Sequence, residues 1–104
     1  MSLKEYQNVV DEWTRQFTPQ YWEPHQIYAR LGEECGELAR EINHLYGPKP
    51  KKKSEEISNL KDEIGDIIFT LICLANSKGI NLDEAFLGTM EKYRNRDNDR
   101  FTKK

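Results

Sequence analysis

The chain has 104 residues with a formal net charge of −2, and 37% of its residues are hydrophobic while 33% are charged. This length predicts one domain, residues 1–104, with a single core. The low hydrophobic fraction is typical of amphipathic helices and favours oligomerisation, because each chain alone has little interior. The nearly balanced charge gives no electrostatic reason to expect nucleic-acid binding. No apolar run approaches the ~20 residues that cross a bilayer and no signal peptide begins the chain, so we expect no membrane contact and a cytoplasmic protein.

The first predicted helix spans residues 3–17, with Ser2 as its N-cap and Glu5 as the second half of a capping box. Two prolines then mark a connection over residues 18–24, because each disfavours helix at the residue before it. Aromatic residues gather at this end of the helix and in the connection. They have two interpretations, core packing or one wall of a nucleobase pocket, where stacking contributes about 1–3 kcal/mol per base. The aromatic residues in question are Trp13, Phe17, Tyr21 and Trp22, with Tyr93 further along the chain as an additional pocket residue.

The second predicted helix runs from residue 25 to residue 46 and ends at the stop signal Gly47-Pro48. Apolar residues at steps of three and four form one stripe that covers a sector of about 80°. Three glutamates fall within roughly 60° of each other directly beside this stripe, whereas solvated carboxylates more often lie on the opposite face. The apolar positions are Ile27, Leu31, Cys35, Leu38, Ile42 and Leu45, and the acidic ones are Glu34, Glu37 and Glu41.

After a polar linker over residues 47–58, which includes a lysine run, a third helix is predicted from residue 56 to residue 77. Glu63 lies beside its apolar stripe, and Asp66 follows three residues later, so the two are neighbours on the helix surface. Residues 67–75 carry only one clearly polar side chain, Thr70. A helix that is apolar nearly all round must be buried nearly all round, and we therefore expect a subunit interface there.

A fourth helix is predicted after Gly79, with Asn81 as its N-cap and Glu84 in the position of a capping box. Its inner face would be apolar, and beyond residue 91 the chain becomes strongly charged. That charged end is expected to be solvated unless it contributes to a site. The residues of the expected inner face are Ala85, Phe86, Met90 and Tyr93.

Two kinds of metal or redox site are excluded by residue counts. Cys35 and Cys73 lack the paired histidines of a zinc site, so we expect both to be reduced, buried thiols. Glu41 and His44 form one Glu-x-x-His motif, but di-iron bundles need that motif twice and His25 has no acid three residues before it.

The two acidic pairs have the same spacing on two helices that each carry an apolar seam. If the seams pack together, Glu34, Glu37, Glu63 and Asp66 converge, and four nearby carboxylates would repel each other unless a cation neutralised them. Ligands that are all oxygen favour Mg²⁺ or Mn²⁺ over zinc. The alternative is that both pairs are ordinary solvated acids, since 18 of the 104 residues are Asp or Glu.

The acidic residues also form a motif pair. Glu33-Glu34-x-x-Glu37 followed by Glu63-x-x-Asp66 resembles the signature of MazG-like nucleoside triphosphate pyrophosphohydrolases, the all-α NTP pyrophosphatases. The resemblance covers residues 28–101, is strongest to the small, single-domain YpjD-type members, and lacks no core position of the signature. It implies a four-to-five-helix MazG-like bundle. The all-round apolar segment 67–75 leads us to expect that oligomerisation, as a homodimer or homotetramer, completes this bundle.

The resemblance also implies site residues and a reaction. Metal ions held by the four acids Glu34, Glu37, Glu63 and Asp66 would bridge the oxygens of a triphosphate, and Glu33 would support the ligands or act as a general base. In this family the last helix carries a lysine, an aromatic residue and an arginine for phosphate, which Lys92, Tyr93 and Arg96 match in kind. The products would be a nucleoside monophosphate and pyrophosphate.

Several alternatives stay open at this point. The residues alone support Mg²⁺-dependent chemistry at a phosphate ester without fixing the bond that is cleaved. The chain could instead be a helical-bundle interaction module in which the acidic motif only binds a stabilising metal. The preferred base, which can be standard or modified, and a role in nucleotide pool sanitation or in nucleotide signalling are equally open.

Overall fold

The computed structural model describes residues 1–48, 56–97, 100 and 102–104. Within these residues the chain forms four α-helices and no strand, which confirms the all-α prediction. In chain order they are α1 (Leu3–Thr14), α2 (Pro24–Tyr46), α3 (Glu56–Ser77) and α4 (Leu82–Arg96). None of these helices is long and apolar enough to span a membrane. The lysine run of the linker lies outside the described residues.

The predicted capping signals are present at two helix starts. The Ser2 hydroxyl accepts a hydrogen bond from the Glu5 backbone N–H while the Glu5 carboxylate accepts one from the Ser2 N–H, which is a complete capping box. At the start of α4, the Asn81 side chain accepts hydrogen bonds from the backbone N–H groups of Asp83 and Glu84. Such reciprocal bonds satisfy amides that have no partner inside the helix.

The end of α1 differs from the prediction, because the helix stops at Thr14 and not at Phe17. The Thr14 hydroxyl donates to the Val10 carbonyl at 2.8 Å, and the Phe17 N–H returns to the Thr14 carbonyl at 3.0 Å. The chain therefore turns three residues earlier than the apolar pattern indicates. This turn brings the connection between α1 and α2 back against α1.

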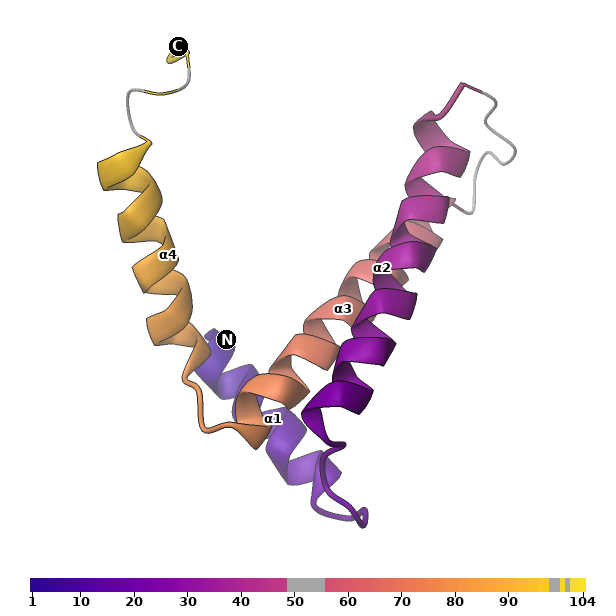
Figure 1. The fold of residues 1–104 in the computed structure, drawn as a ribbon, viewed down its shortest axis with the longest axis vertical. Coiled ribbons are helices and arrows are strands. Elements are labelled where there is room, and N and C mark those ends of the chain that lie inside the picture. Colours follow the sequence, from indigo (N-terminus) through magenta and orange to yellow (C-terminus); the bar gives the residue numbers. More distant parts are fainter. Residues whose placement is uncertain (49–55, 98–99, 101) are drawn as a thin grey trace.

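The helices are arranged as a V (Figure 1). Helices α2 and α3 lie side by side and form one arm, while α1 packs against α3 near the base of the V and against α4, which forms the other arm. The Asp83 carboxylate joins α4 to α1 by accepting hydrogen bonds from the Leu3 and Lys4 backbone N–H groups. Its negative charge also lies at the positive end of the α1 dipole.

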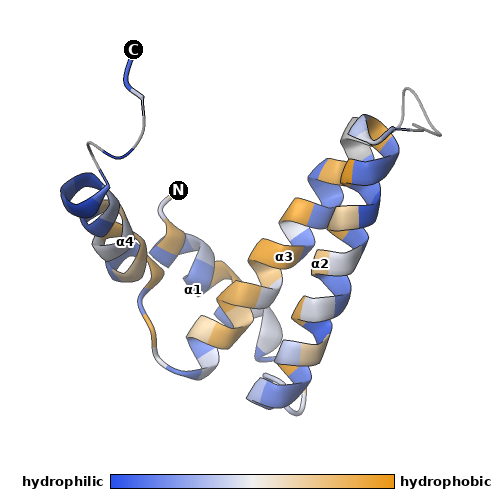
Figure 2. Ribbon diagram, turned by 45° about the horizontal axis from the view of Figure 1, so that its top comes forward, coloured by the Kyte–Doolittle hydropathy of each residue, from blue (hydrophilic) through white to orange (hydrophobic). Residues whose placement is uncertain are grey.

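This arrangement leaves most of the apolar surface uncovered. The radius of gyration is 16.9 Å, whereas a compact domain of this length would have about 13 Å. Only Ile27, Ile72 and Ala75 are buried hydrophobic residues among those described. Figure 2 shows hydrophobic residues along nearly the whole of α3. Large hydrophobic residues that stay exposed on the two arms include Tyr28, Ile42, Ile64, Ile68, Phe69, Leu71, Phe86, Leu87 and Tyr93.

Three expectations about burial are therefore wrong for the single chain. Cys35 is exposed and Cys73 is only partly buried, although both cysteines are free as expected. The apolar positions of α4 form no buried face, and α4 has no buried residue. The physical reason is the same in each case: apolar periodicity identifies a face that would be buried by a neighbouring helix, and none of the four described helices covers these faces.

The buried line of α2 consists of Ile27, Glu34 and Glu41. These residues are seven apart, which is nearly two helical turns, so they lie on one line along the helix. The edge of α2 that carries the acids thus faces α3, while the centre of the apolar stripe lies further round. The prediction that oligomerisation completes the bundle stays a prediction.

Candidate metal centre and the adjoining cavity

Three of the predicted metal ligands come together between α2 and α3. Glu34 and Glu37 of α2 and Glu63 of α3 each offer a carboxylate oxygen, and these oxygens all lie within 4.8 Å of one another. The i, i+3 spacing places both α2 acids on the same side of the helix, and the pairing of α2 with α3 brings Glu63 opposite them. The sequence-based convergence of these acids is therefore seen in the structure for three residues of the four.

The cluster contains buried carboxylate oxygens that lack hydrogen-bond partners. Glu34 is only 2% exposed, and its Oε1 pairs with the Arg30 Nε at 2.9 Å, one helical turn away. Its Oε2, and likewise the Oε2 of Glu63, is buried with no partner. A buried carboxylate oxygen without a partner is energetically costly, so such atoms indicate a ligand position.

The protonation of Glu63 reflects this environment. Burial of its carboxyl group, followed by the close approach of the Glu34 and Glu37 carboxyl groups, raises its pKa to about 7. The protonated form of Glu63 is thus favoured beside the other two acids, because three adjacent negative charges repel one another. Together with the unpartnered oxygens, this arrangement fits a hard divalent cation such as Mg²⁺ or Mn²⁺.

The remaining two acids of the motif occupy different positions. Asp66 is exposed and lies outside the group of three, but it lines the same cavity as Glu34. Glu33 is exposed on α2 and does not belong to the cluster. The sequence spacing therefore predicted the meeting of Glu34, Glu37 and Glu63. It also predicted that Asp66 would join them, whereas Asp66 lies outside this group.

A cavity of about 340 Å³ adjoins the cluster, with Glu34 and Asp66 in its wall. This volume lies in the range of small-molecule sites. Four of the five aromatic residues proposed for the pocket line it, all except Tyr93. Trp13 packs edge-to-face on Phe17 and on Phe69, with ring centroids 5.0 and 6.2 Å apart. The aromatic residues in the wall are Trp13, Phe17, Tyr21, Trp22 and Phe69.

The predicted phosphate-binding residues are not near this cavity in the single chain. Lys92, Tyr93 and Arg96 lie on α4, in the opposite arm of the V (Figure 1). The Lys92 ammonium and the Arg96 guanidinium lie 5.5 and 5.6 Å from the centre of the Tyr93 ring, and Arg96 also pairs with Asp97 at 2.9 Å. Tyr93 is thus not part of the cavity wall.

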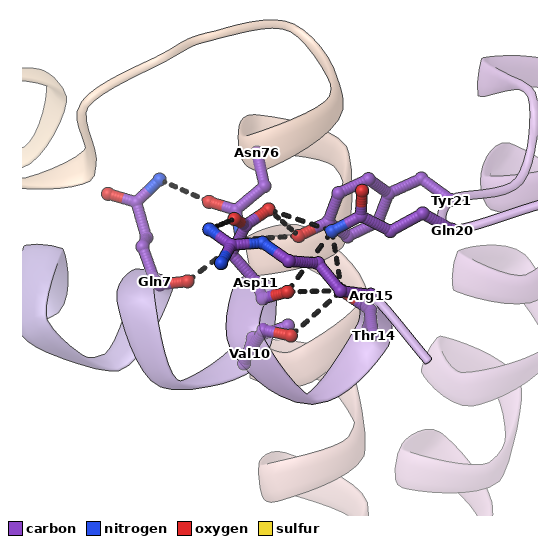
Figure 3. Close-up of polar contacts among 8 residues, drawn as sticks. All are labelled: Gln7, Val10, Asp11, Thr14, Arg15, Gln20, Tyr21 and Asn76. Carbon is purple, nitrogen blue, oxygen red and sulfur yellow. Dashed lines mark hydrogen bonds and ion pairs between the residues drawn. The ribbon is translucent and has the colours of Figure 1, made fainter. Parts of the chain in front are cut away.

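A hydrogen-bond network holds the wall of the cavity in place (Figure 3). The Tyr21 hydroxyl donates to Asp11 Oδ1 at 2.7 Å and accepts from the Asn76 amide at 2.9 Å. Gln7, only 2% exposed, donates to Asn76 Oδ1 and to the Ile80 carbonyl. The network therefore joins α1, the connection before α2, and the end of α3.

Sequence reasoning missed three residues of the site. Arg30 could have been found from its i, i+4 position relative to Glu34, which is a favourable ion-pair spacing. Phe69 follows Asp66 by three residues and so lies on the same side of α3. Gln20 carries no sequence signal for its role, since its position depends on the early end of α1.

The fold and site together define an all-α protein with a cluster of three carboxylates beside an aromatic cavity. Residues 22–101 match the model of the MazG nucleotide pyrophosphohydrolase domain, and the chain belongs to this family. It is 50% identical over 103 residues to the uncharacterized protein YpjD of Bacillus subtilis (strain 168), covering 99% of this chain and 93% of that protein.

Two crystal structures resemble the fold closely. That of YPJD from Bacillus subtilis has a TM-score of 0.83 at 48% identity, covering 89% of this chain and 95% of that one. A Bacillus-conserved MazG protein, described as a nucleotide pyrophosphohydrolase, has a TM-score of 0.80 at 40% identity, covering 95% of this chain and 96% of that one. The family assignment thus rests on both sequence and structure.

Proposed function

We propose that this chain hydrolyses nucleoside or deoxynucleoside triphosphates, with standard or modified bases, to the nucleoside monophosphate and pyrophosphate, and that Mg²⁺ is its cofactor. The observation that carries the proposal is the cluster of Glu34, Glu37 and Glu63, with its two unpartnered buried oxygens, beside an aromatic cavity. Membership of the MazG family supports hydrolysis of a nucleotide with release of pyrophosphate.

The three clustered acids, joined by Asp66, would hold the cation. When bound, Mg²⁺ would neutralise the charge that develops on the phosphate oxygens. It would also lower the pKa of a water molecule bound to it. Arg30 keeps Glu34 oriented toward the cluster through the 2.9 Å ion pair. Glu33, which is exposed beside the cluster on α2, is available to accept a proton from an attacking water.

The cavity would bind the nucleoside part of the substrate. Trp13, Phe17 and Trp22 provide aromatic surface for a base, since stacking on such rings is favourable for every base. Glu34 and Asp66 lie in the wall of this cavity, so the phosphates would extend from it toward the proposed metal ligands. A nucleotide bound in this way spans the cavity and the cluster.

We further propose that a homodimer or homotetramer completes the site. Lys92 and Arg96 lie in the opposite arm from the cluster, so in this geometry a second copy of the chain would have to bring them to the triphosphate. The exposed apolar residues of α3 and α4 supply the surface for such an association. Cationic side chains there would bind the phosphate charge that Mg²⁺ leaves.

The test is incubation with a panel of standard and modified nucleoside and deoxynucleoside triphosphates with Mg²⁺, followed by separation of the products. We expect monophosphate and pyrophosphate in a ratio of one to one, and no reaction when the metal is chelated. Release of orthophosphate and a diphosphate would show that a different bond is cleaved. Stabilisation by Mg²⁺ without turnover of any triphosphate would favour the second candidate, a metal-stabilised interaction module, which the exposed apolar surface also supports.

A further inference from the structure

The Gln20 side chain lines the cavity and is held in one orientation. Its amide nitrogen lies within hydrogen-bond distance of three acceptors: the Asp11 carbonyl at 3.1 Å, Asp11 Oδ1 at 3.0 Å and Thr14 Oγ1 at 3.2 Å. Turning the amide over would place its oxygen against these same atoms. Neither Asp11 oxygen carries a hydrogen, and the Thr14 hydroxyl already donates to the Val10 carbonyl at 2.8 Å. The orientation with the nitrogen toward Asp11 is therefore fixed by chemistry.

Asp11 remains a pure acceptor because its own partners keep it ionised. The hydrogen bond from Tyr21, then the one from Arg15, lowers the pKa of the Asp11 carboxyl below its usual range. Arg15 binds Oδ2 at 2.7 Å while Tyr21 binds Oδ1, so both oxygens are occupied (Figure 3). An ionised carboxylate can only accept, and the Gln20 nitrogen must face it.

The consequence is that Gln20 offers its carbonyl oxygen as an acceptor. This oxygen accepts no hydrogen bond from the described residues, and in Figure 3 it points away from Asp11. The hydroxyl groups in the cavity wall cannot donate a hydrogen bond to a substrate base, because those of Thr14, Thr70 and Tyr21 each donate to an acceptor of the protein. Besides the weak S–H donor of Cys73, the neutral side-chain donors of the cavity wall are then the indole N–H groups of Trp13 and Trp22, which are both about half exposed.

We propose that Gln20 is a specificity-determining residue that recognises an exocyclic amino group on the substrate base. A cytosine- or adenine-type base presents an N–H donor there, which pairs with the Gln20 oxygen. A uracil- or hypoxanthine-type base presents a carbonyl oxygen instead, which would face another acceptor and leave both without a partner. This inference rests on the proposed function for its substrate class, and concerns the choice of base and not the bond cleaved.

The test uses two matched pairs of substrates that differ only in amino or keto group: dCTP against dUTP, and dATP against dITP. For the wild type we expect kcat/KM to be higher for the amino member of each pair by about three- to tenfold, the effect of one hydrogen bond. Gln20→Met keeps the length of the side chain and removes the acceptor, so both ratios should fall toward one. Gln16→Met changes an exposed glutamine outside the cavity, and should leave both ratios as in the wild type.

A purely structural role of Gln20 is distinguished by the same data. If Gln20→Met only disturbed the connection, kcat/KM would fall equally for amino and keto substrates and the ratios would not change, which overturns the proposal. A wild-type preference for keto bases would also overturn it, and would indicate the indole donors instead.

Binding of the corresponding monophosphates separates this inference from the proposed hydrolysis. The dissociation constants of dCMP and dUMP can be compared whether or not triphosphates are cleaved. Tighter binding of dCMP that is lost in Gln20→Met supports the inference even if no triphosphate reacts, in which case only the proposed function fails. Hydrolysis with equal affinities and equal kcat/KM values would support the proposed function and overturn the role of Gln20.

Discussion

Among individual residues, Glu34 matters most to the candidate site. Its carboxyl group is buried, and only one of its two oxygens has a partner. Among the described residues its cationic partner is Arg30, whose side chain is half exposed and so contributes less than a fully buried ion pair would. A bound cation would add the second partner that Glu34 lacks. Arg30 and such a cation would then neutralise the same carboxylate together.

Replacing Arg30 by Gln tests whether Arg30 and a bound cation neutralise the same Glu34 carboxylate. Without the guanidinium, the metal-free protein should lose about 1–2 kcal/mol of its free energy of unfolding, since Glu34 would keep its charge in a buried position. The rise in melting temperature on adding Mg²⁺ should become larger than in the wild type, because more uncompensated charge remains. Thermal unfolding with and without Mg²⁺ measures both effects. A smaller Mg²⁺ effect in Arg30→Gln would contradict this view of Glu34.

Asp11 gives a prediction on pH dependence. Its hydrogen bonds with Tyr21, Arg15 and Gln20 lower its folded-state pKa below 3.8, the ordinary value that the unfolded chain retains. A depressed folded-state pKa contributes stability that is present above the unfolded pKa and is lost as the pH falls through the folded one. We thus expect Asp11→Asn to be less stable than the wild type at pH 7, with the difference shrinking below about pH 4. Urea unfolding across pH 2–7 measures this difference, and a difference independent of pH would exclude the role.

At the scale of the helices, the end of α3 depends on one backbone conformation. Gly79 has φ of 66°, and the Ile80 and Gly79 N–H groups return to the carbonyls of Ala75 and Asn76, which is the Schellman pattern. An added Cβ would meet no atom within 4 Å, so the cost of a substitution comes from the backbone alone. This makes the position a clean test of the helix end.

Gly79→Ala should lower the free energy of unfolding by about 1 kcal/mol, because the left-handed conformation is unfavourable for residues with a Cβ. The matched control is Gly88→Ala inside α4, where an added Cβ also meets nothing within 4 Å. There alanine should stabilise by up to about 1 kcal/mol, since it favours helix over glycine. Chemical unfolding of both variants provides the comparison, and equal changes in both would contradict the assigned conformation at Gly79.

Sequence patterns predicted the elements better than their faces. The caps at Ser2 and Asn81 and the bounds of α3 follow from local chemistry, and the structure has them where the sequence indicates. The early end of α1 was missed because the apolar pattern continues to Phe17, whereas the Phe17 N–H already turns back to the Thr14 carbonyl. The exposure of Cys35 was missed because periodicity predicts that a face is apolar, and not which chain covers it.

In the candidate site, too, local spacing predicted some features, whereas others depend on the tertiary structure. The i, i+3 spacing predicted the meeting of Glu34, Glu37 and Glu63, since two packed helices fix those positions. The network around Gln20 could not be predicted, because its members are far apart in the sequence and meet only through the turn after α1. The distance between the cluster and Lys92 is likewise a property of the tertiary arrangement.

At the scale of the whole molecule, the open V is the main feature to be explained. A radius of gyration of 16.9 Å with only three buried hydrophobic residues among those described is unusual for an isolated domain. We therefore expect a stable homodimer or homotetramer at micromolar concentration, measured by sedimentation. Ile68→Asp, on the exposed side of α3, should shift the protein toward smaller species. A wild type that sediments as a monomer at this concentration would contradict the expectation.

The central claim, a catalytic divalent cation held by the carboxylate cluster, is tested most directly by one measurement on Glu37→Gln. This variant should lose turnover by orders of magnitude, because a neutral amide is a poorer cation ligand. Without metal it should be as stable as the wild type or more so, since one charge of a repelling cluster is removed, and Mg²⁺ should raise its melting temperature less. Glu12→Gln, an exposed acid on α1, is the matched control and should behave as the wild type. Full activity of Glu37→Gln, with an unchanged Mg²⁺ effect, would show that the cluster is not the metal site.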